Sequence, residues 1–204
     1  MAHTGGWRAG RLLREDGARM PHRVCPWWLG YLLLLPLRRI WQNPRKLLGT
    51  LVREGMTVLE PGPGMGFFTL DVARMVGPGG RVLAVDVQEK MLKALRRRAR
   101  KAGLLDRIDI RPAEPGRLGV EDLAGRVDLV LAIFVVHEMP EAGAFFTEAH
   151  RALRSGGRLL FAEPRRHVPK DAFDQSLGAA VQAGFTRLGD FRFPGARAVL
   201  LART

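Results

Sequence analysis

Cysteine and lysine are scarce in this sequence. Cys25 is the single cysteine among 204 residues, so no disulfide bond can form within the chain, and a reducing cytoplasm is the expected compartment. Of the 33 basic residues only five are lysine, and a GC-rich genome produces such an arginine excess without selection for nucleic-acid binding. The net charge of +13 is therefore weak evidence for a nucleic-acid partner.

A long apolar segment is also missing. The longest apolar run, Trp27–Leu35, ends at Pro36 and is far shorter than the roughly 20 residues that span a bilayer. The arginines near the N-terminus are not followed by an apolar segment of signal-peptide length. Hydrophobic residues make up 47% and charged residues 26%, which is typical of a globular protein, and the length fits one domain. We expect a cytoplasmic protein that is neither secreted nor membrane-spanning.

The first 50 residues differ in character from the rest. Residues 1–20 are polar and basic without apolar periodicity, which predicts a mobile basic tail. Residues 21–50 predict a helical lid, in which an apolar helix is interrupted by Pro36 and a second, short helix begins after Asn43. Asn43 is a favourable N-cap and Pro44 suits the first helical position.

From Gly55 onward, short strands alternate with helices. The predicted strands are 56–60, 81–86, 107–111, 127–134 and 158–162, and the predicted helices are 67–75, 89–102, 142–153 and 170–183. A turn is expected at residues 155–157, and a closing antiparallel hairpin is expected from residues 187–193 and 196–202. Repeated strand–helix units require a parallel sheet. The predicted fold class is α/β: a Rossmann-like, doubly wound, mostly parallel seven-stranded sheet with a C-terminal antiparallel hairpin.

Ligands in such folds bind at the carboxyl ends of the strands, and the motifs of this chain lie there. The first strand ends in Glu60-Pro-Gly-Pro-Gly-Met-Gly66, and the second ends in Asp86. Glycines let a backbone approach a ligand closely, and a carboxylate can accept both hydroxyls of a ribose. The third glycine comes one residue earlier than in dinucleotide folds, and Glu60 would repel a pyrophosphate but suit a cationic ligand.

Four segments in order resemble the motifs of class I S-adenosylmethionine-dependent methyltransferases, and the arrangement is similar to small prokaryotic members of that family. They are Val58–Gly66, Arg81–Asp86, Val127–Val130 and Leu153–Leu160. The resemblance implies that residues 51–204 form a methyltransferase domain with S-adenosylmethionine as its cofactor.

The same resemblance implies a role for each cofactor-site candidate. Glu60 would lie near the methionine amino group, and Asp86 would hold the ribose hydroxyls. The remaining candidates are Gly62, Gly64 and Gly66 along the methionine and ribose, Val87 or Gln88 against the adenine, Glu114 at the adenine amino group, and Phe134 under the cofactor.

Acceptor chemistry in this fold follows the fourth strand, where the sequence offers His137 and Glu138. His137 has the pKa range of a general base for a hydroxyl, thiol or amine, and Glu138 is the second catalytic candidate. A structural alternative is that His137 caps the helix region or orients Glu138. His167 lies at the same sheet edge, either in the pocket or on the surface. The spacing of these three residues fits no strong metal-binding pattern, so we predict no metal.

The acceptor itself stays open, and a small or lipophilic molecule is the leading prediction. The aromatic segment around Trp27 and Trp28 suits an apolar lid, contact with a membrane surface, or plain packing of a helix on the sheet. Cys25 is either a small apolar residue or a thiol near the acceptor. Two alternatives remain: RNA methylation through the basic stretch 90–101, although sequence motifs of nucleic-acid methyltransferases are absent, and a non-catalytic cofactor-binding subunit.

Overall fold

The computed structural model describes residues 40–204. The predicted tail, the interrupted apolar helix, Cys25 and the paired tryptophans lie outside the described residues. The strands are β1 (Thr57–Pro61), β2 (Arg81–Asp86), β3 (Ile108–Pro112), β4 (Val127–Ile133), β5 (Leu153–Pro164), β6 (Phe185–Asp190) and β7 (Ala196–Arg203). The α-helices are α3 (Pro44–Leu48), α4 (Thr69–Met75), α5 (Glu89–Lys101), α6 (Ala142–Ala152) and α7 (Lys170–Gln182), and the 3-10 helices are η1 (Leu105–Arg107), η2 (Glu121–Leu123) and η3 (Val136–Glu138).

The seven strands form one sheet in the order β3-β2-β1-β4-β5-β7-β6. Strands β1 to β5 pair in parallel, whereas β7 runs antiparallel to both β5 and β6. The predicted fold class, including the antiparallel C-terminal pair, is confirmed. Because the chain winds outward from β1 in one direction and from β4 in the other, the carboxyl ends of β1 and β4 flank the switch point at which such folds bind ligands.

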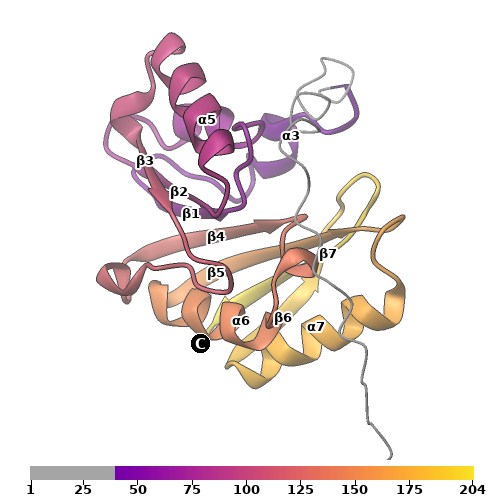
Figure 1. Ribbon diagram of the computed structural model, residues 1–204. Coiled ribbons are helices and arrows are strands. Elements are labelled where there is room, and N and C mark those ends of the chain that lie inside the picture. The colour runs from indigo at the N-terminus through magenta and orange to yellow at the C-terminus, as the bar shows by residue number, and fades with distance from the viewer. Residues whose placement is uncertain (1–39) are drawn as a thin grey trace, which may run out of the picture.

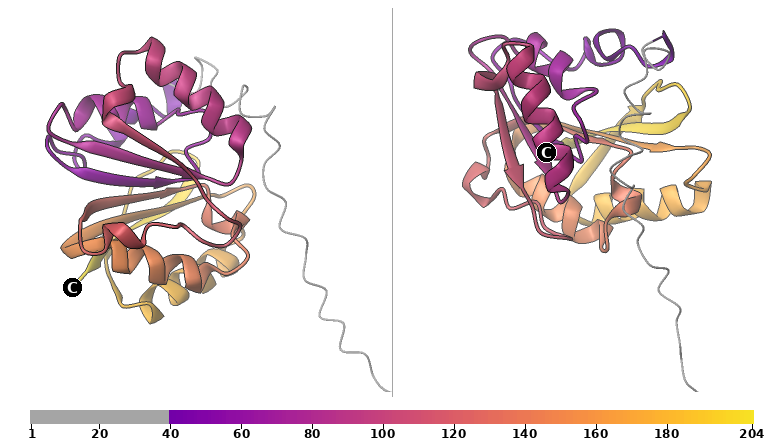
Figure 2. Two further views of the ribbon diagram at one scale, coloured as in Figure 1. Left: turned by 60° about the vertical axis from the view of Figure 1, so that its left-hand side comes forward. Right: turned by 45° about the horizontal axis from the view of Figure 1, so that its top comes forward.

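Helices cover both faces of the sheet, with α5 on one side and α6 and α7 on the other (Figures 1 and 2). Neighbouring residues of each central strand serve opposite cores because side chains alternate along a strand. Val58 and Leu129 face the core of α4 and α5, whereas Leu59 and Val130 face the core of α6 and α7. Both faces are therefore apolar, as a buried parallel sheet requires.

Three predicted segments differ from the structure by two residues or more. Helix α4 begins at Thr69 rather than at residue 67, because a turn with left-handed glycines extends to Phe68. Residues 155–157 form no separate turn: β5 is continuous from Leu153, and its register against β4 shifts between Val127 and Leu129. β6 spans Phe185–Asp190 instead of 187–193.

The predicted start of α3 is confirmed. The Asn43 side chain accepts hydrogen bonds from the backbone N–H groups of Arg45 and Lys46, at 3.1 and 3.3 Å, and Pro44 is the first helical residue. Between residues 40 and 204, no helix combines the length and apolarity needed to cross a membrane.

Candidate active site

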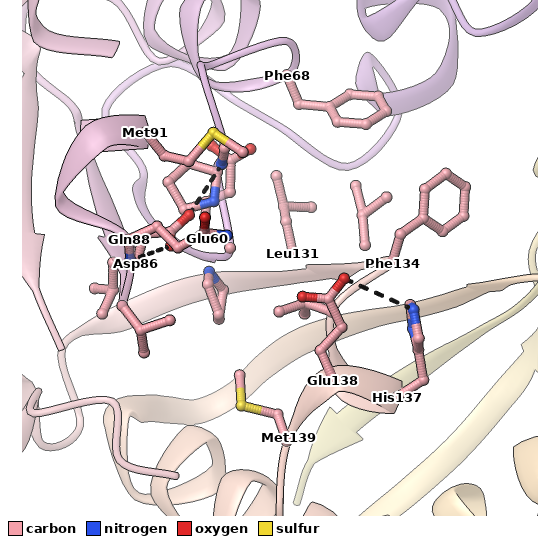
Figure 3. A pocket seen from close by; sticks show the side chains of 18 of the residues that line it. Glu60, Phe68, Asp86, Gln88, Met91, Leu131, Phe134, His137, Glu138 and Met139 are labelled. Carbon is pink, nitrogen blue, oxygen red and sulfur yellow. Dashed lines mark hydrogen bonds and ion pairs between the residues drawn. The ribbon is translucent and has the colours of Figure 1, made fainter. Parts of the chain in front are cut away.

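A pocket of about 920 Å³ opens at the carboxyl ends of β1, β2 and β4 (Figure 3). Its volume is near the upper end of the roughly 300–1,000 Å³ typical of small-molecule sites. Every candidate site residue except Gly66 lines this pocket: Glu60, Gly62, Gly64, Asp86, Val87, Gln88, Glu114, Phe134, His137, Glu138 and His167. The topology therefore brings together side chains that lie far apart in the sequence.

The turn after β1 depends on glycine at Gly62. Its φ is +64°, and a Cβ there would lie 2.6 Å from Cγ2 of Val135, in the turn after β4. Gly64 also has a positive φ, of +54°, but a Cβ there would have no neighbour within 4 Å. The first glycine lets the two turns pack together, and the second keeps the pocket wall free of a side chain.

Gly66 is not among the residues that line the pocket, and its expected place along the methionine and ribose stays a prediction. A Cβ on Gly66 would lie 2.4 Å from Cδ1 of Leu95, a buried residue of α5. The third glycine therefore allows close packing of the turn against a helix.

Glu60 is a buried carboxylate with an unused acceptor. Its side chain ends β1 in the pocket wall and is 3% exposed. The Oε2 atom is buried, and among residues 40–204 it has no hydrogen-bond partner. Burial raises the pKa of Glu60 to about 7, the hydroxyl of Thr69 opposes this rise, and the negative charge of Asp86 adds to it. A buried acceptor of this kind is costly unless a ligand pairs with it, so Glu60 suits a cationic group.

Asp86 ends β2 and is held by the backbone. Its Oδ1 accepts from the N–H of Gln88 at 2.8 Å, and its Oδ2 accepts from the N–H of Gly64 at 3.3 Å. Burial raises the pKa of Asp86, and these backbone hydrogen bonds oppose the rise. Each oxygen keeps a lone pair for a further donor, which is what binding two ribose hydroxyls requires.

The candidates for the adenine lie beside Asp86. Val87 and Gln88 continue from β2, and Glu114 follows β3 on the same side of the pocket. Met91, from the first turn of α5, adds apolar surface that the sequence analysis did not single out. Together they line this part of the pocket with both apolar and polar side chains.

Phe134 directly follows β4 in a conformation unusual for a residue with a side chain. Its φ is +61°, while its N–H donates to the Ala162 carbonyl at 2.8 Å. Its ring packs edge-on against Phe193, with centroids 5.5 Å apart, and Phe193 contacts Phe68 at 6.1 Å. This aromatic cluster holds Phe134 in the pocket wall, and such local strain is common at functional sites.

His137 contacts a carboxylate that the sequence analysis did not single out. Its Nδ1 lies 2.6 Å from Oε2 of Glu163, and its backbone N–H donates to Oε1 of the same residue at 3.0 Å. Glu163 is 2% exposed and lies near the end of β5. The signal was present, since Glu163 is an acidic residue at the end of an apolar strand, as Glu60 and Asp86 are.

Glu138 lies on the other side of the His137 ring, with Oε1 3.9 Å from Nε2 (Figure 3). Burial lowers the pKa of His137, but the hydrogen bond to Glu163 and the charges of Glu163 and Glu138 outweigh burial, so the net shift is upward. The arrangement is that of a base held by a buried acid.

The pocket mouth is formed in part by Trp41 and Gln42. Trp41 is 76% exposed, and the Gln42 side chain donates to the carbonyl of Pro194 at 3.0 Å. In the described part of the chain, no three His, Cys, Asp or Glu side chains are grouped as a metal site would need.

Comparison with known proteins agrees with this geometry. Residues 59–161 match the family described as "Methyltransferase domain". An arsenite methyltransferase from Halobacterium salinarum is 34% identical over 127 residues, which cover 62% of this chain and 31% of the relative. A ubiquinone/menaquinone biosynthesis C-methyltransferase from Escherichia fergusonii is 33% identical over 112 residues, which cover 55% of this chain and 44% of the relative. The chain thus spans less than half the length of either protein.

The fold is also similar to that of solved structures. A SAM-dependent methyltransferase from Aquifex aeolicus superimposes with a TM-score of 0.78 at 24% identity, covering 89% of this chain and all of the other.

These findings confirm the predicted methyltransferase class and, with it, S-adenosylmethionine as the cofactor. The pocket fits this cofactor, because Glu60 offers an unpaired carboxylate oxygen to a cation and Asp86 offers two fixed acceptors. Residues 59–161 span about half of the chain and include the pocket walls formed by β1 to β4 and the segments after them, and so the chain belongs to the methyltransferase domain family.

Proposed function

We propose that this protein transfers a methyl group from S-adenosylmethionine to a small, mainly apolar organic acceptor. The observation that carries the proposal is the buried, unpaired Oε2 of Glu60 in the wall of a pocket that continues toward His137. A cationic amino group is the partner that such an oxygen needs, and Asp86 lies beside it for a ribose.

The pocket has two chemically different ends (Figure 3). Glu60, Asp86 and Gln88 gather at one end, where we place the cofactor. His137 and Glu138 stand at the other, next to Phe134 and Met139. An acceptor with an apolar body and one polar reacting group suits this second end.

The named acceptors of the relatives differ from each other. One relative is an arsenite methyltransferase and another a C-methyltransferase of ubiquinone/menaquinone biosynthesis. Soft elements such as arsenic are held by thiolates, and this chain has one cysteine. We therefore favour an organic acceptor over arsenite.

An RNA acceptor has less support. The basic side chains of α5 lie on its outer face, while Met91, Leu95 and Ala99 face inward. Arg98 donates to the carbonyl of Met65, and Lys93 pairs with Glu89, so part of this charge is engaged within the domain. A solvated helix face accounts for the remaining charge.

Calorimetric titration tests the cofactor end with three ligands: S-adenosylmethionine, S-adenosylhomocysteine and 5′-methylthioadenosine. Asp86→Asn should weaken the binding of all three ligands by roughly 1–3 kcal/mol, because all three carry the ribose. Glu60→Gln should weaken only the first two, because 5′-methylthioadenosine lacks the amino group. Asp109→Asn is the matched control, since Asp109 pairs with Arg111 outside the pocket and its loss should change nothing.

Wild-type protein that binds none of these ligands would refute the proposal. A Glu60→Gln protein that loses 5′-methylthioadenosine to the same extent would show that Glu60 acts elsewhere. Turnover is then followed as S-adenosylhomocysteine release with phenols, quinols, thiols and amines. Tight cofactor binding without release of product from any of these acceptors would favour the non-catalytic subunit.

A further inference from the structure

The carboxylate of Glu163 reaches the pocket only through His137. Glu163 itself does not line the pocket, whereas the His137 ring does. Both carboxylate oxygens are engaged by the same residue: Oε1 by its backbone N–H at 3.0 Å, and Oε2 by Nδ1 at 2.6 Å. Two bonds to one residue fix the position of the ring as well as the direction in which it faces.

These two hydrogen bonds determine which ring nitrogen of His137 carries the proton. An ionised carboxylate accepts hydrogen bonds and cannot donate them, so the neutral His137 ring must present N–H at Nδ1. The lone pair is then on Nε2, which lies 3.9 Å from Oε1 of Glu138, beyond hydrogen-bond distance. Nε2 is therefore available to a donor that enters the pocket.

We propose that Glu163 is a positioning residue that holds His137 in this tautomer, so that Nε2 serves as the general base for an acceptor whose attacking atom is the oxygen of an aromatic hydroxyl. The inference rests on the methyltransferase function proposed above.

The step balances in atoms and charge. The hydroxyl oxygen of the acceptor forms a bond to the methyl carbon while the bond from that carbon to sulfur breaks and leaves its electron pair on sulfur. The hydroxyl proton moves to Nε2 of His137, which becomes an imidazolium. Glu163 stabilises that cation through Nδ1, as a buried acid does in other histidine-based active sites.

The surroundings of His137 suit an aromatic hydroxyl. Phe134 precedes it in the chain, Met139 follows it, and both line the pocket with apolar surface. An aromatic ring packs favourably against both kinds of side chain. The hydroxyl is the one polar group of such a ligand, and it needs a single acceptor, which Nε2 provides.

Other ionisable groups face the same pocket and are part of any pH dependence. Glu163 from β5 and Glu138 from η3 contact the ring directly, and His167 from the segment after β5 also lines the pocket. Glu60, Asp86, Glu114 and Arg117 line it too, in the segments that follow β1, β2 and β3 or end them. A test must therefore observe His137 itself.

Glu163→Gln separates positioning from packing because it keeps the size of the side chain. The amide oxygen is the only group that can accept from the His137 backbone N–H, so the amide nitrogen is turned toward Nδ1. That nitrogen donates, which forces the ring proton onto Nε2 and removes the base. The ring would stay in place with the wrong tautomer.

The first measurement is ¹⁵N NMR of the histidine rings across pH, with His137 assigned by His137→Gln. In the wild-type protein the neutral His137 ring should carry its proton on Nδ1. In Glu163→Gln the proton should be on Nε2, and the pKa of His137 should be lower because the neighbouring negative charge is gone. A wild-type proton on Nε2, or a pKa of His137 that does not change in Glu163→Gln, would overturn the inference without any acceptor being present.

The second measurement is methylation of a panel of phenols and naphthols. Glu163→Gln should lower kcat by about 10²- to 10⁴-fold with little change in acceptor KM. The same substitution in a His137→Gln background should cost nothing more. Asp128→Asn is the matched control, because Asp128 also accepts from one backbone N–H, of Thr57, and one side-chain nitrogen, of Arg154, but lies away from the pocket. It should leave both kcat and the His137 titration unchanged.

The outcomes keep the two proposals apart. If wild-type protein methylates the panel and Glu163→Gln has an undiminished kcat, the positioning role of Glu163 is overturned and the methyltransferase function still stands. Wild-type protein that binds the cofactor but methylates no aromatic hydroxyl would overturn the acceptor group, and the NMR titration would still decide the tautomer. Wild-type protein that fails to bind S-adenosylmethionine would refute the proposed function instead.

Discussion

Three buried carboxylates differ in how the fold satisfies them. Asp86 has a backbone N–H on each oxygen, and Glu163 has two donors from one histidine. Glu60 keeps an oxygen with no partner among the described residues. A satisfied carboxylate is preorganised, whereas an unsatisfied one gains most from a ligand. The three residues are therefore suited to fixed ribose binding, positioning of a base, and recognition of a cation.

The glycines of the first turn allow a prediction at the same scale. Gly62 has a left-handed backbone, and Gly62→Ala would place a Cβ 2.6 Å from the stiff, branched side chain of Val135. We therefore expect a loss of roughly 3 kcal/mol in the free energy of unfolding. Gly64→Ala meets open space, so it should cost about 1 kcal/mol of stability, and its methyl group should weaken cofactor binding. Denaturant unfolding and calorimetry measure the two effects.

Gly103→Ala is the control for backbone strain alone. Gly103 has the same φ as Gly62, +64°, with no atom within 4 Å of a Cβ, and does not line the pocket. Cofactor affinity should be unchanged in this variant. If Gly62→Ala were no less stable than Gly103→Ala, the contact with Val135 would not explain why glycine is needed at position 62.

At the residue scale the sequence predicts which strand ends carry functional residues, but it says less about the direction in which each residue faces. Glu60, Asp86 and His137 were identified because each follows an apolar strand at the edge where ligands bind. Gly66 was expected along the cofactor because it belongs to the same motif, and only the packing of α5 shows that Leu95 leaves no room for a side chain there. Glu163 was passed over because its partner, His137, lies 26 residues away in the chain.

At the scale of elements, periodicity and capping residues predict types better than ends. Strand β2 and the start of α3 were predicted without error, since an apolar run and an Asn-Pro cap are local signals. The extension of β5 back to Leu153 was missed because Gly156 and Gly157 favour a turn locally. Instead, Leu153 pairs with Val127, and after a register shift the pairing with β4 continues from Arg158 beside Leu129.

Helix α3 provides a test of such a local signal. Asn43→Ala removes the two hydrogen bonds that cap the helix, so we expect a loss of about 1 kcal/mol in the free energy of unfolding. Asn43→Asp keeps the acceptor and should stay close to wild type. Guanidinium unfolding measures both, and equal stability of the alanine variant and wild type would contradict the role of the cap.

At the scale of the whole molecule, the strand order makes one pocket out of distant segments, and this has an energetic consequence. Glu60 and Asp86 end the adjacent strands β1 and β2, so both carboxylates are buried close to one another, and the pKa of each is raised. A site built for a cation therefore stores unfavourable charge while no cation is bound, and the stability of the ligand-free protein should depend on pH.

The sign follows from proton binding. The pKa of Glu60 is about 7 in the folded protein against 4.5 in the absence of burial, so between these values the folded state holds a proton that the unfolded state has lost. Stability should therefore fall as pH rises from about 4.5 to 7, by an upper limit of roughly 3 kcal/mol. Glu60→Gln should remove this part of the slope, as measured by denaturant unfolding at a series of pH values.

Comparing the two proteins isolates Glu60, because Asp86, His137 and His150 titrate in both. The raised pKa of His137 extends the fall in stability to higher pH, and the lowered pKa of His150 opposes it just below 6.5. Saturating S-adenosylhomocysteine should also flatten the wild-type slope, since its amino group stabilises the ionised carboxylate. If wild type and Glu60→Gln had parallel stability curves in the absence of ligand, the pKa of Glu60 would be the same in the folded and unfolded states. Burial would then not raise the free energy of the ionised carboxylate, and the unpaired oxygen of Glu60 would not be the group that recognises the cation.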